Sequence, residues 1–147
     1  GPKESFAEVV RQLAACYDAA FFIVGAPDDR DYADEVIRGM EPAVQNFCGE
    51  TSLTDLAALI GAVDLLVTVD TGATHIAATT GVPMVTMYGC TSPNRWHPMN
   101  KRACVLTTSE ACCPCSFSAE DCPTSPKPKC LWNITPSMVL KECDGLL

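Results

Sequence analysis

The stretch DLLVTVDTGATHIAATT, residues 64–80, constrains this chain more than any other part of it. Its apolar run Leu65–Val69 is rich in β-branched residues, as in a strand that is buried on both faces. The run stops at Asp70–Gly72 and is followed by the small, alanine-rich segment Ala73–Thr80, which has a helical pattern. A buried strand, a tight glycine-containing turn and a helix start together aim backbone N–H groups at an anion.

Three side chains of this turn suggest how an anion would be held. Gly72 lets the backbone approach a ligand closely because it carries no Cβ. The Asp70 carboxylate repels a phosphate, so we expect it to orient the turn or to accept a hydrogen bond from a hydroxyl. His75 falls in the first helical turn, where its ring can donate to a phosphate oxygen. The alternative is an ordinary helix start, with Asp70 or Thr71 as the N-cap and His75 buried.

The motif Asp70–Ala73 after apolar residues is also typical of aspartic proteases. In that class it lies in an all-β domain, and an enzyme of this size pairs two aspartates across a dimer. The residues that follow, THIAATTGVP, lack the period-two alternation expected of strands. A DTG aspartic protease is therefore a minor alternative.

Composition limits the class of partner. The chain has 147 residues, enough for one domain, and 48% of them are hydrophobic. Its formal net charge of −8 argues against a nucleic-acid groove, which needs a basic face. A single diphosphate is not excluded, because a local helix terminus can hold one against the overall field. No apolar run approaches the ~20 residues of a membrane span, and no signal-peptide pattern opens the chain.

Helical and strand patterns alternate along the chain with short connections. This predicts an α/β fold, a Rossmann-like parallel sheet with helices on both faces. No G-x-G-x-x-G follows any strand, so the usual NAD-binding fingerprint is absent. Polar turns follow four of the strands, at 28–29, 50–52, 70–75 and 89–95, which predicts a small-ligand crevice at one sheet edge. We expect helices over 3–17, 31–39, about 53–60 and from 135, and strands over 19–24, 44–48, 65–69, 84–88 and 103–107.

The runs DTGATHIAA (70–78) and GVPMVTMYGCTSP (81–93) resemble the C-terminal half of glycosyltransferase family 9, the heptosyltransferase type. The family pattern there is an apolar strand, D-[ST]-G-x-x-H-x-A, and then G-x-P-x-x-x-x-[FY]-G-P-T-x-P. The similarity is strongest over Leu53–Pro93 and continues more loosely from Phe21 to Val139. Cys90 stands where the family usually has proline.

The resemblance implies the C-terminal half of a two-domain GT-B glycosyltransferase, the half that binds the nucleotide-sugar donor. It implies an ADP-heptose-like ADP-sugar, transfer to a lipopolysaccharide-type or other glycan acceptor, and no required cofactor. It places Asp29 near the ribose and Thr51 near the base of the donor. From the residues alone, Asp29 is equally well a helix-start carboxylate, and Thr51 an exposed loop residue. The contacts implied for the phosphates and the sugar are Asp70, Thr71, Gly72, Ala73, Thr74 and His75.

The resemblance also implies parts that this sequence does not contain. The family's first strand, with its small-residue turn and lysine, would lie upstream of residue 1, and so would the N-terminal acceptor domain with its base. We therefore expect a fragment with little activity alone, in a cytoplasmic bacterial enzyme that is peripheral to the inner membrane. A sheet without its central first strand should be marginally stable or associate to cover the gap. The expected organisation is a single nucleotide-sugar-binding domain, with a core (1–110), a Cys/Pro-rich loop (111–131) and a C-terminal helix (132–147).

Ten cysteines are unusual for a chain of this length. Cys112, Cys115, Cys122 and Cys130 supply four thiolates, enough for a structural zinc ion, although their spacing is not a pair of C-x2-C knuckles. Disulfides and free thiols are the alternatives. The second hypothesis for the whole chain is therefore a cysteine-rich metal-binding or redox interaction module on an α/β scaffold. For the scattered cysteines, a small buried hydrophobe is the default.

A basic cluster follows the GCTSP turn. It can neutralise donor phosphates, face an acceptor, or simply be a solvated loop. Its members are Arg95, Trp96, His97, Lys101 and Arg102.

Overall fold

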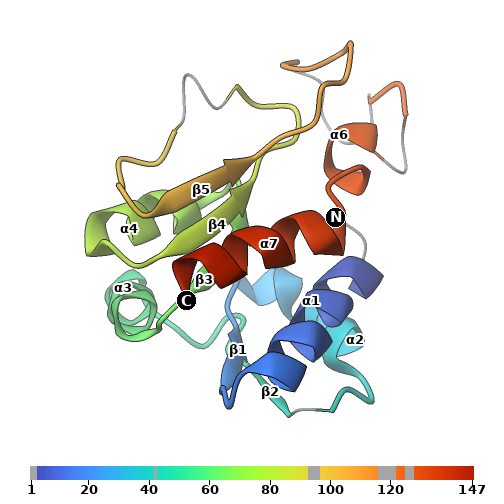
Figure 1. The fold of residues 1–147 in the computed structure, drawn as a ribbon. Coiled ribbons are helices and arrows are strands. Elements are labelled where there is room, and N and C mark those ends of the chain that lie inside the picture. The colour runs from blue at the N-terminus through green and yellow to red at the C-terminus, as the bar shows by residue number, and fades with distance from the viewer. Residues whose placement is uncertain (1–2, 42, 93–96, 116–121, 125–127) are drawn as a thin grey trace. The chain divides into compact units, whose positions relative to one another are not determined.

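The computed structural model describes residues 3–41, 43–92, 97–115, 122–124 and 128–147 (Figure 1). Helices and strands alternate from α1 to β4, as expected, and every described strand pair is parallel. The chain divides into two compact units, residues 1–59 and 60–147, and the boundary falls within helix α3 (Leu53–Ala62). In Figure 1 the first unit runs from blue to teal and the second from green to red.

The first unit holds a two-stranded parallel sheet and two helices. Strand β1 (Phe21–Ile23) pairs with β2 (Val44–Asn46), and helix α2 (Arg30–Ile37) packs on both β2 and α1 (Lys3–Cys16). Helix α1 is amphipathic, and its buried residues Val9 and Leu13 lie four positions apart on one face, as expected of a helix packed against a neighbour. Ala7 is buried as well.

The second unit is built on a three-stranded parallel sheet of order β3-β4-β5. The strands are β3 (Leu66–Val69), β4 (Met84–Met87) and β5 (Ala103–Leu106). All four residues of the central strand β4 are buried, which accounts for its continuous apolar sequence. Helix α4 (Gly72–Thr80) packs on β3 and helix α7 (Pro136–Leu146) on β4 and β5, and Figure 1 shows them on opposite sides of the sheet.

Two helix starts follow the predicted chemistry. Ser52 precedes α3, and its hydroxyl accepts a hydrogen bond from the Asp55 N–H at 3.1 Å while the Asp55 carboxylate accepts from the Ser52 N–H at 3.2 Å. Thr135 is the N-cap of α7 and its side chain accepts from the N–H of Met138, with Pro136 as the first helical residue. The short helices η1 (Pro27–Asp29) and α6 (Lys129–Trp132) were not predicted, because neither is long enough to show a period.

The α/β fold class is confirmed, but the predicted single sheet is two sheets. Among the described strands, β1 pairs only with β2, and β3 pairs only with β4. None of the helices in the described ranges has the length and apolarity to cross a bilayer.

Candidate functional site

The turn between β3 and α4 is fixed by buried hydrogen bonds. Thr71 occupies the N-cap position in an extended conformation (φ −145°, ψ 175°). Thr74 is fully buried, and its hydroxyl donates to the Val69 carbonyl at 2.7 Å and accepts from the Thr71 N–H at 3.5 Å. The Asp70 N–H continues the sheet by donating to the Met87 carbonyl at 3.0 Å. The turn is therefore held in one conformation by hydrogen bonds to the ends of β3 and β4.

The outer side of this turn is open. Gly72 and Ala73 are the first two residues of α4, so their N–H groups have no partner within the helix. No other partner is seen for these two N–H groups within the part of the chain that the structure describes. Thr71, Gly72 and His75 are exposed, and a Cβ built on Gly72 would meet no atom within 4 Å. The predicted anion site thus consists of free helix N–H groups with space in front of them.

Asp70 is anchored from the next strand. The Thr91 hydroxyl, which lies beyond the end of β4, donates a hydrogen bond to Asp70 Oδ2. Tyr88, at the end of β4, is fully buried, and burial together with the nearby Asp70 charge raises the pKa of its phenol. Sequence reasoning identified Asp70 but missed Thr91. The signal was present, because the carboxyl ends of adjacent parallel strands lie at one edge of a sheet.

In the first unit, the Asp29 carboxylate stabilises the start of a helix, which was the alternative to a ribose contact. Its Oδ2 accepts a hydrogen bond from the Ala26 N–H at 2.8 Å, at the start of η1 and α2. The preceding Gly25 is required by this close approach, since a Cβ there would lie 2.9 Å from Asp29 Oδ2. One carboxylate oxygen is therefore engaged by the turn, and the other has no hydrogen-bond partner among the described residues.

Thr51 follows a second glycine turn of the same unit. Gly49 has φ +75°, a conformation that suits glycine, and its N–H donates to the Gly25 carbonyl at 3.0 Å, which ties the turns after β1 and β2 together. Glu50 pairs with Arg30 at 2.7 Å, and its hydrogen bond and charge raise the pKa of that guanidinium. Thr51 itself is half-buried. Asp29 and Thr51 thus follow the carboxyl ends of parallel strands in one unit, as Asp70–His75 do in the other.

Comparison with known proteins decides the family. The family model described as glycosyltransferase family 9 (heptosyltransferase) matches residues 2–124. The chain belongs to glycosyltransferase family 9. Among curated proteins, lipopolysaccharide heptosyltransferase 2 of Escherichia coli K12 is 32% identical, and the match covers 99% of this chain and 42% of that protein.

Solved structures of family 9 proteins share the fold. E. coli ADP-heptose LPS heptosyltransferase II has a TM-score of 0.83 at 27% identity, covering 99% of this chain and 41% of that one. A family 9 protein of Veillonella parvula also has a TM-score of 0.83, at 28% identity, over 99% of this chain and 41% of that one. E. coli heptosyltransferase WaaC, solved with ADP, has a TM-score of 0.75 at 22% identity, over 99% and 39% of the two chains, and shows the fold alone. The chain therefore spans about two fifths of the length of these family members.

The aspartic-protease alternative is excluded. The DTG motif of this family 9 chain ends a strand in a parallel sheet and opens helix α4, whereas the protease interpretation requires an all-β domain. The distinguishing signal was the alanine-rich run after Gly72.

Of the three alternatives for the basic cluster, neutralisation of donor phosphates gains no support from Arg102. Arg102 donates from Nη2 to the Gly81 carbonyl at 2.9 Å, which is at the carboxyl end of α4, opposite to Gly72. The physical reason is that residues 101–102 precede β5, so they lie at the amino edge of a parallel sheet. Arg95 and Trp96 lie outside the described residues, and His97 Nδ1 is 2.9 Å from the Pro98 carbonyl oxygen.

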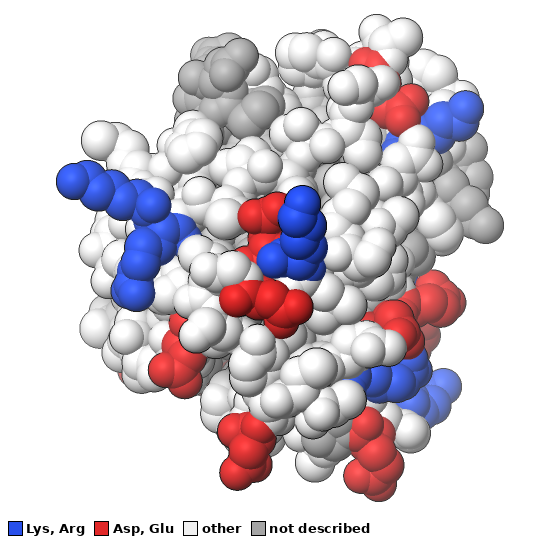
Figure 2. All heavy atoms as spheres, in the orientation of Figure 1, with Lys and Arg blue, Asp and Glu red and all other residues white. Residues whose placement is uncertain are grey.

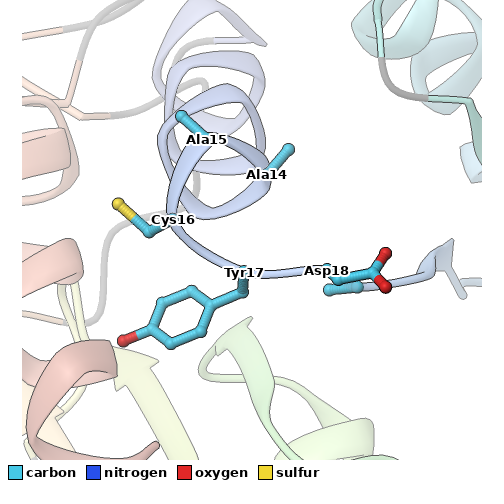
Figure 3. Close-up of a pocket in the computed structure, with 6 residues that line it drawn as sticks. Ala14, Ala15, Cys16, Tyr17 and Asp18 are labelled. Atoms are coloured by element: carbon cyan, nitrogen blue, oxygen red, sulfur yellow. The ribbon is translucent and has the colours of Figure 1, made fainter.

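Two other features were candidates for an anion site: the charge on the face drawn in Figure 2 and a pocket at the end of α1. Neither has the geometry to hold an anion. On the face drawn in Figure 2, basic side chains of the described residues are scattered among acidic ones and form no broad field. The pocket in Figure 3 is lined by the consecutive residues Ala14–Ala19 at the end of α1. Its walls come from one short segment, and its charged residue is Asp18, so it lacks converging groups that would hold an anion.

The cysteine segment gives the zinc interpretation no support. Among the described residues, no group of three or more His, Cys, Asp or Glu side chains is placed to hold a metal ion. Cys122 interacts instead with its near neighbour, its sulfur 3.4 Å from Thr124 Oγ1, and this hydrogen bond lowers the pKa of its thiol. All ten cysteines are free, including the predicted ligands Cys112, Cys115 and Cys130. Of the scattered cysteines, Cys48 and Cys143 are buried, as the default interpretation predicts, whereas Cys90 and Cys104 are half-buried and Cys16 is exposed.

Proposed function

We propose that this chain binds the diphosphate of a nucleotide-sugar donor at the amino end of α4, and that the ligand is an ADP-sugar of the ADP-heptose type. In the whole protein this would be the donor-binding part of a glycosyltransferase that modifies a lipopolysaccharide-type or other glycan acceptor. The observation that carries the proposal is the open space at Gly72 in front of two helix N–H groups that lack described partners.

The physical argument is that a diphosphate suits this geometry. The amino end of a helix carries a partial positive charge, and free N–H groups there can donate directly to phosphate oxygens. His75 is exposed on the first turn of α4, so it brings an imidazole ring to the same end of the helix as Gly72. Thr71 is exposed as well, whereas the buried side chain of Thr74 supports the turn and leaves only its backbone for a ligand.

Asp70 has a different role in the proposal. Its carboxylate would be repelled by phosphate, so we assign it to a hydroxyl of the donor, with Thr91 holding one of its oxygens. Asp29 and Thr51 are assigned to the ribose and the base, as the family resemblance implies. The names of relatives support the choice of ligand, since one neighbour of 27% identity is titled an ADP-heptose LPS heptosyltransferase.

We also propose that the group needed to activate the acceptor lies outside this chain, which spans about two fifths of its relatives' length, so that the chain binds the donor without appreciable transfer. Base-assisted transfer needs a group that deprotonates the acceptor hydroxyl while the donor phosphate leaves, and the proposal assigns no such group to this chain.

The test is a nuclear magnetic resonance titration of the isotopically labelled chain with adenosine, AMP, ADP and an ADP-sugar. We expect the amide signals of Gly72 and Ala73 to shift with ADP and with the ADP-sugar, and to shift much less with adenosine. The ADP-sugar should add a shift at Asp70. Shifts that map elsewhere, or equal responses to adenosine and ADP, would refute the diphosphate assignment.

A further inference from the structure

Cysteines from separate parts of the sequence meet at the end of β4. Cys90 follows Gly89 directly after that strand, and its carbonyl accepts a hydrogen bond from the Cys115 N–H at 2.7 Å. A Cβ built on Gly89 would lie 3.3 Å from the sulfur of Cys130, at the start of α6. The turn after β4, the loop at 112–115 and helix α6 are therefore packed together, and each brings at least one thiol.

Cys90 and Cys115 have the backbone geometry that a disulfide needs. The direct bond of 2.7 Å from the Cys115 N–H to the Cys90 carbonyl holds the two Cα atoms roughly 5–6 Å apart, close to the spacing of hydrogen-bonded residues in a sheet. Disulfides bridge Cα separations of about 4.4–6.8 Å, so the two backbones need not move to be linked. Burial raises the pKa of the Cys90 thiol, and the nearby Cys115 thiol raises it further, as expected of two thiols in one neighbourhood.

We propose that Cys90 and Cys115 are a reversible redox pair, which closes to a disulfide by exchange with a small-molecule disulfide of the glutathione class. In the first step, one of the two sulfurs loses its proton and attacks the small disulfide, forming a mixed disulfide and releasing one small thiol. In the second step, the other sulfur loses its proton and attacks the first protein sulfur, releasing the second small thiol. The protein loses two electrons and two protons, and the small disulfide gains them as two thiols.

A competing pair lies next to this one. Burial, together with the neighbouring Cys130 and Cys112 thiols, raises the pKa of Cys113 to about 12. Within the described residues, however, no backbone hydrogen bond joins Cys113 to Cys130; the Cys113 N–H donates to the Glu110 carbonyl at 3.0 Å instead. A backbone hydrogen bond therefore holds Cys90 and Cys115 at a separation that suits a disulfide, and no described backbone bond does this for Cys113 and Cys130.

The disulfide would affect the proposed donor site through Thr91. Thr91 follows Cys90 in the chain, and its hydroxyl holds Asp70. A link between Cys90 and Cys115 would fix the turn that carries Thr91, so the redox state of the pair would set how firmly Asp70 is held. This consequence rests on the proposed function, whereas formation of the disulfide does not.

The test is differential alkylation of the full chain without nucleotide, after equilibration with mixtures of oxidised and reduced glutathione. We expect peptide mapping to find a Cys90–Cys115 linked peptide that is lost on reduction with dithiothreitol. In a Cys115→Ser variant, Cys90 should instead retain glutathione as a stable mixed disulfide. A Cys104→Ser variant is the matched control, because Cys104 is a half-buried thiol on β5, and it should leave the linked peptide unchanged.

Three outcomes would overturn the proposal: a Cys113–Cys130 link in place of the expected one, mixed disulfides without any internal link, or alkylation of Cys90 and Cys115 at every glutathione ratio. The mapping is carried out on the unsubstituted chain, so its outcome does not depend on whether the serine variants fold. Donor titration of the oxidised and the reduced chain then tests the link to Asp70 separately.

Discussion

The Thr91 hydroxyl donates a hydrogen bond to the Asp70 carboxylate and joins the turns that follow the adjacent strands β3 and β4. The two residues are far apart in the sequence, and the parallel register, with Val69 opposite Met87, brings their turns to one edge of the sheet. Asp70 can therefore present its second oxygen in a fixed direction, which a carboxylate on an isolated turn could not do.

Replacing Thr91 with valine should weaken binding of an ADP-sugar. Valine has nearly the shape of threonine but cannot donate, so Asp70 loses its support; a hydrogen bond of this kind contributes about 1 kcal/mol, roughly a fivefold change in Kd. Calorimetry should show this loss for the ADP-sugar and a smaller one for ADP. Thr91→Ser keeps the hydroxyl and should bind nearly as the original chain does. Equal affinities for the valine and serine variants would contradict the positioning role of Thr91.

Replacing Gly72 with alanine should separate folding from binding. Gly72 is not in the left-handed region and its Cβ would meet no atom, so the free energy of unfolding should change by less than about 1 kcal/mol. The added methyl group would occupy the approach to the helix N–H groups, and affinity for ADP should fall by about tenfold, about 1.4 kcal/mol. Gly145→Ala, at a glycine of α7 with equally open space, is the control and should leave binding unchanged. Undiminished ADP affinity in Gly72→Ala would place the diphosphate elsewhere.

Replacing each of two buried threonines with valine should change the free energy of unfolding in opposite directions. Thr86 and Thr74 are both fully buried, but Thr86 Oγ1 has no hydrogen-bond partner among the described residues, whereas the Thr74 hydroxyl donates to the Val69 carbonyl. Thr86→Val removes an unsatisfied polar atom and should stabilise the chain by about 1 kcal/mol. Thr74→Val breaks a buried hydrogen bond and should cost about 1–3 kcal/mol. Urea unfolding measures both changes, and destabilisation by Thr86→Val would mean that its hydroxyl is satisfied.

Stability should fall in alkaline solution, in part because of Cys143. Burial, with the nearby Asp144 charge, raises the pKa of this thiol to about 11, whereas an unfolded cysteine titrates near ~8.5. Between these values the unfolded chain has released the proton and the folded chain still holds it, so the free energy of unfolding falls as the pH rises. Below the lower value this contribution is fully present. Cys143→Ala should reduce the slope measured by urea unfolding at several pH values.

The control for this measurement is Cys16→Ala, which removes an exposed thiol from the end of α1. It should leave the alkaline slope unchanged. An unchanged slope in Cys143→Ala would show that other groups cause the alkaline loss.

The chain should associate as its concentration rises. Among the described strands, β1 and β3 each have one edge without a partner strand, and such edges pair readily with other chains. Light scattering coupled to size exclusion should show a mass that grows with loading. Phe22 is 39% exposed on β1, and Phe22→Lys should reduce the association because charged edge residues oppose pairing. A constant monomer mass at every loading would refute this prediction.

Local patterns in the sequence predicted the elements and the turn. The β-branched run 65–69, the glycine at 72 and the threonine-proline pair at 135–136 each specify a local conformation, and the structure has β3, α4 and α7 there. The family resemblance, carried by the motif from Asp70 onward, was confirmed. The donor contacts themselves remain a prediction.

The sequence by itself determined the order of helices and strands, because periodicity, glycine turns and caps act over a few residues. Only the tertiary structure decided that Thr91 supports Asp70, that Cys115 joins Cys90 and that Arg102 lies at the carboxyl end of α4. Each of these contacts joins segments separated by about 20 residues or more, and strand register and loop packing bring them together. Local patterns can place two turns at the same edge of a sheet, but they do not encode the register and loop packing that select which residues pair there.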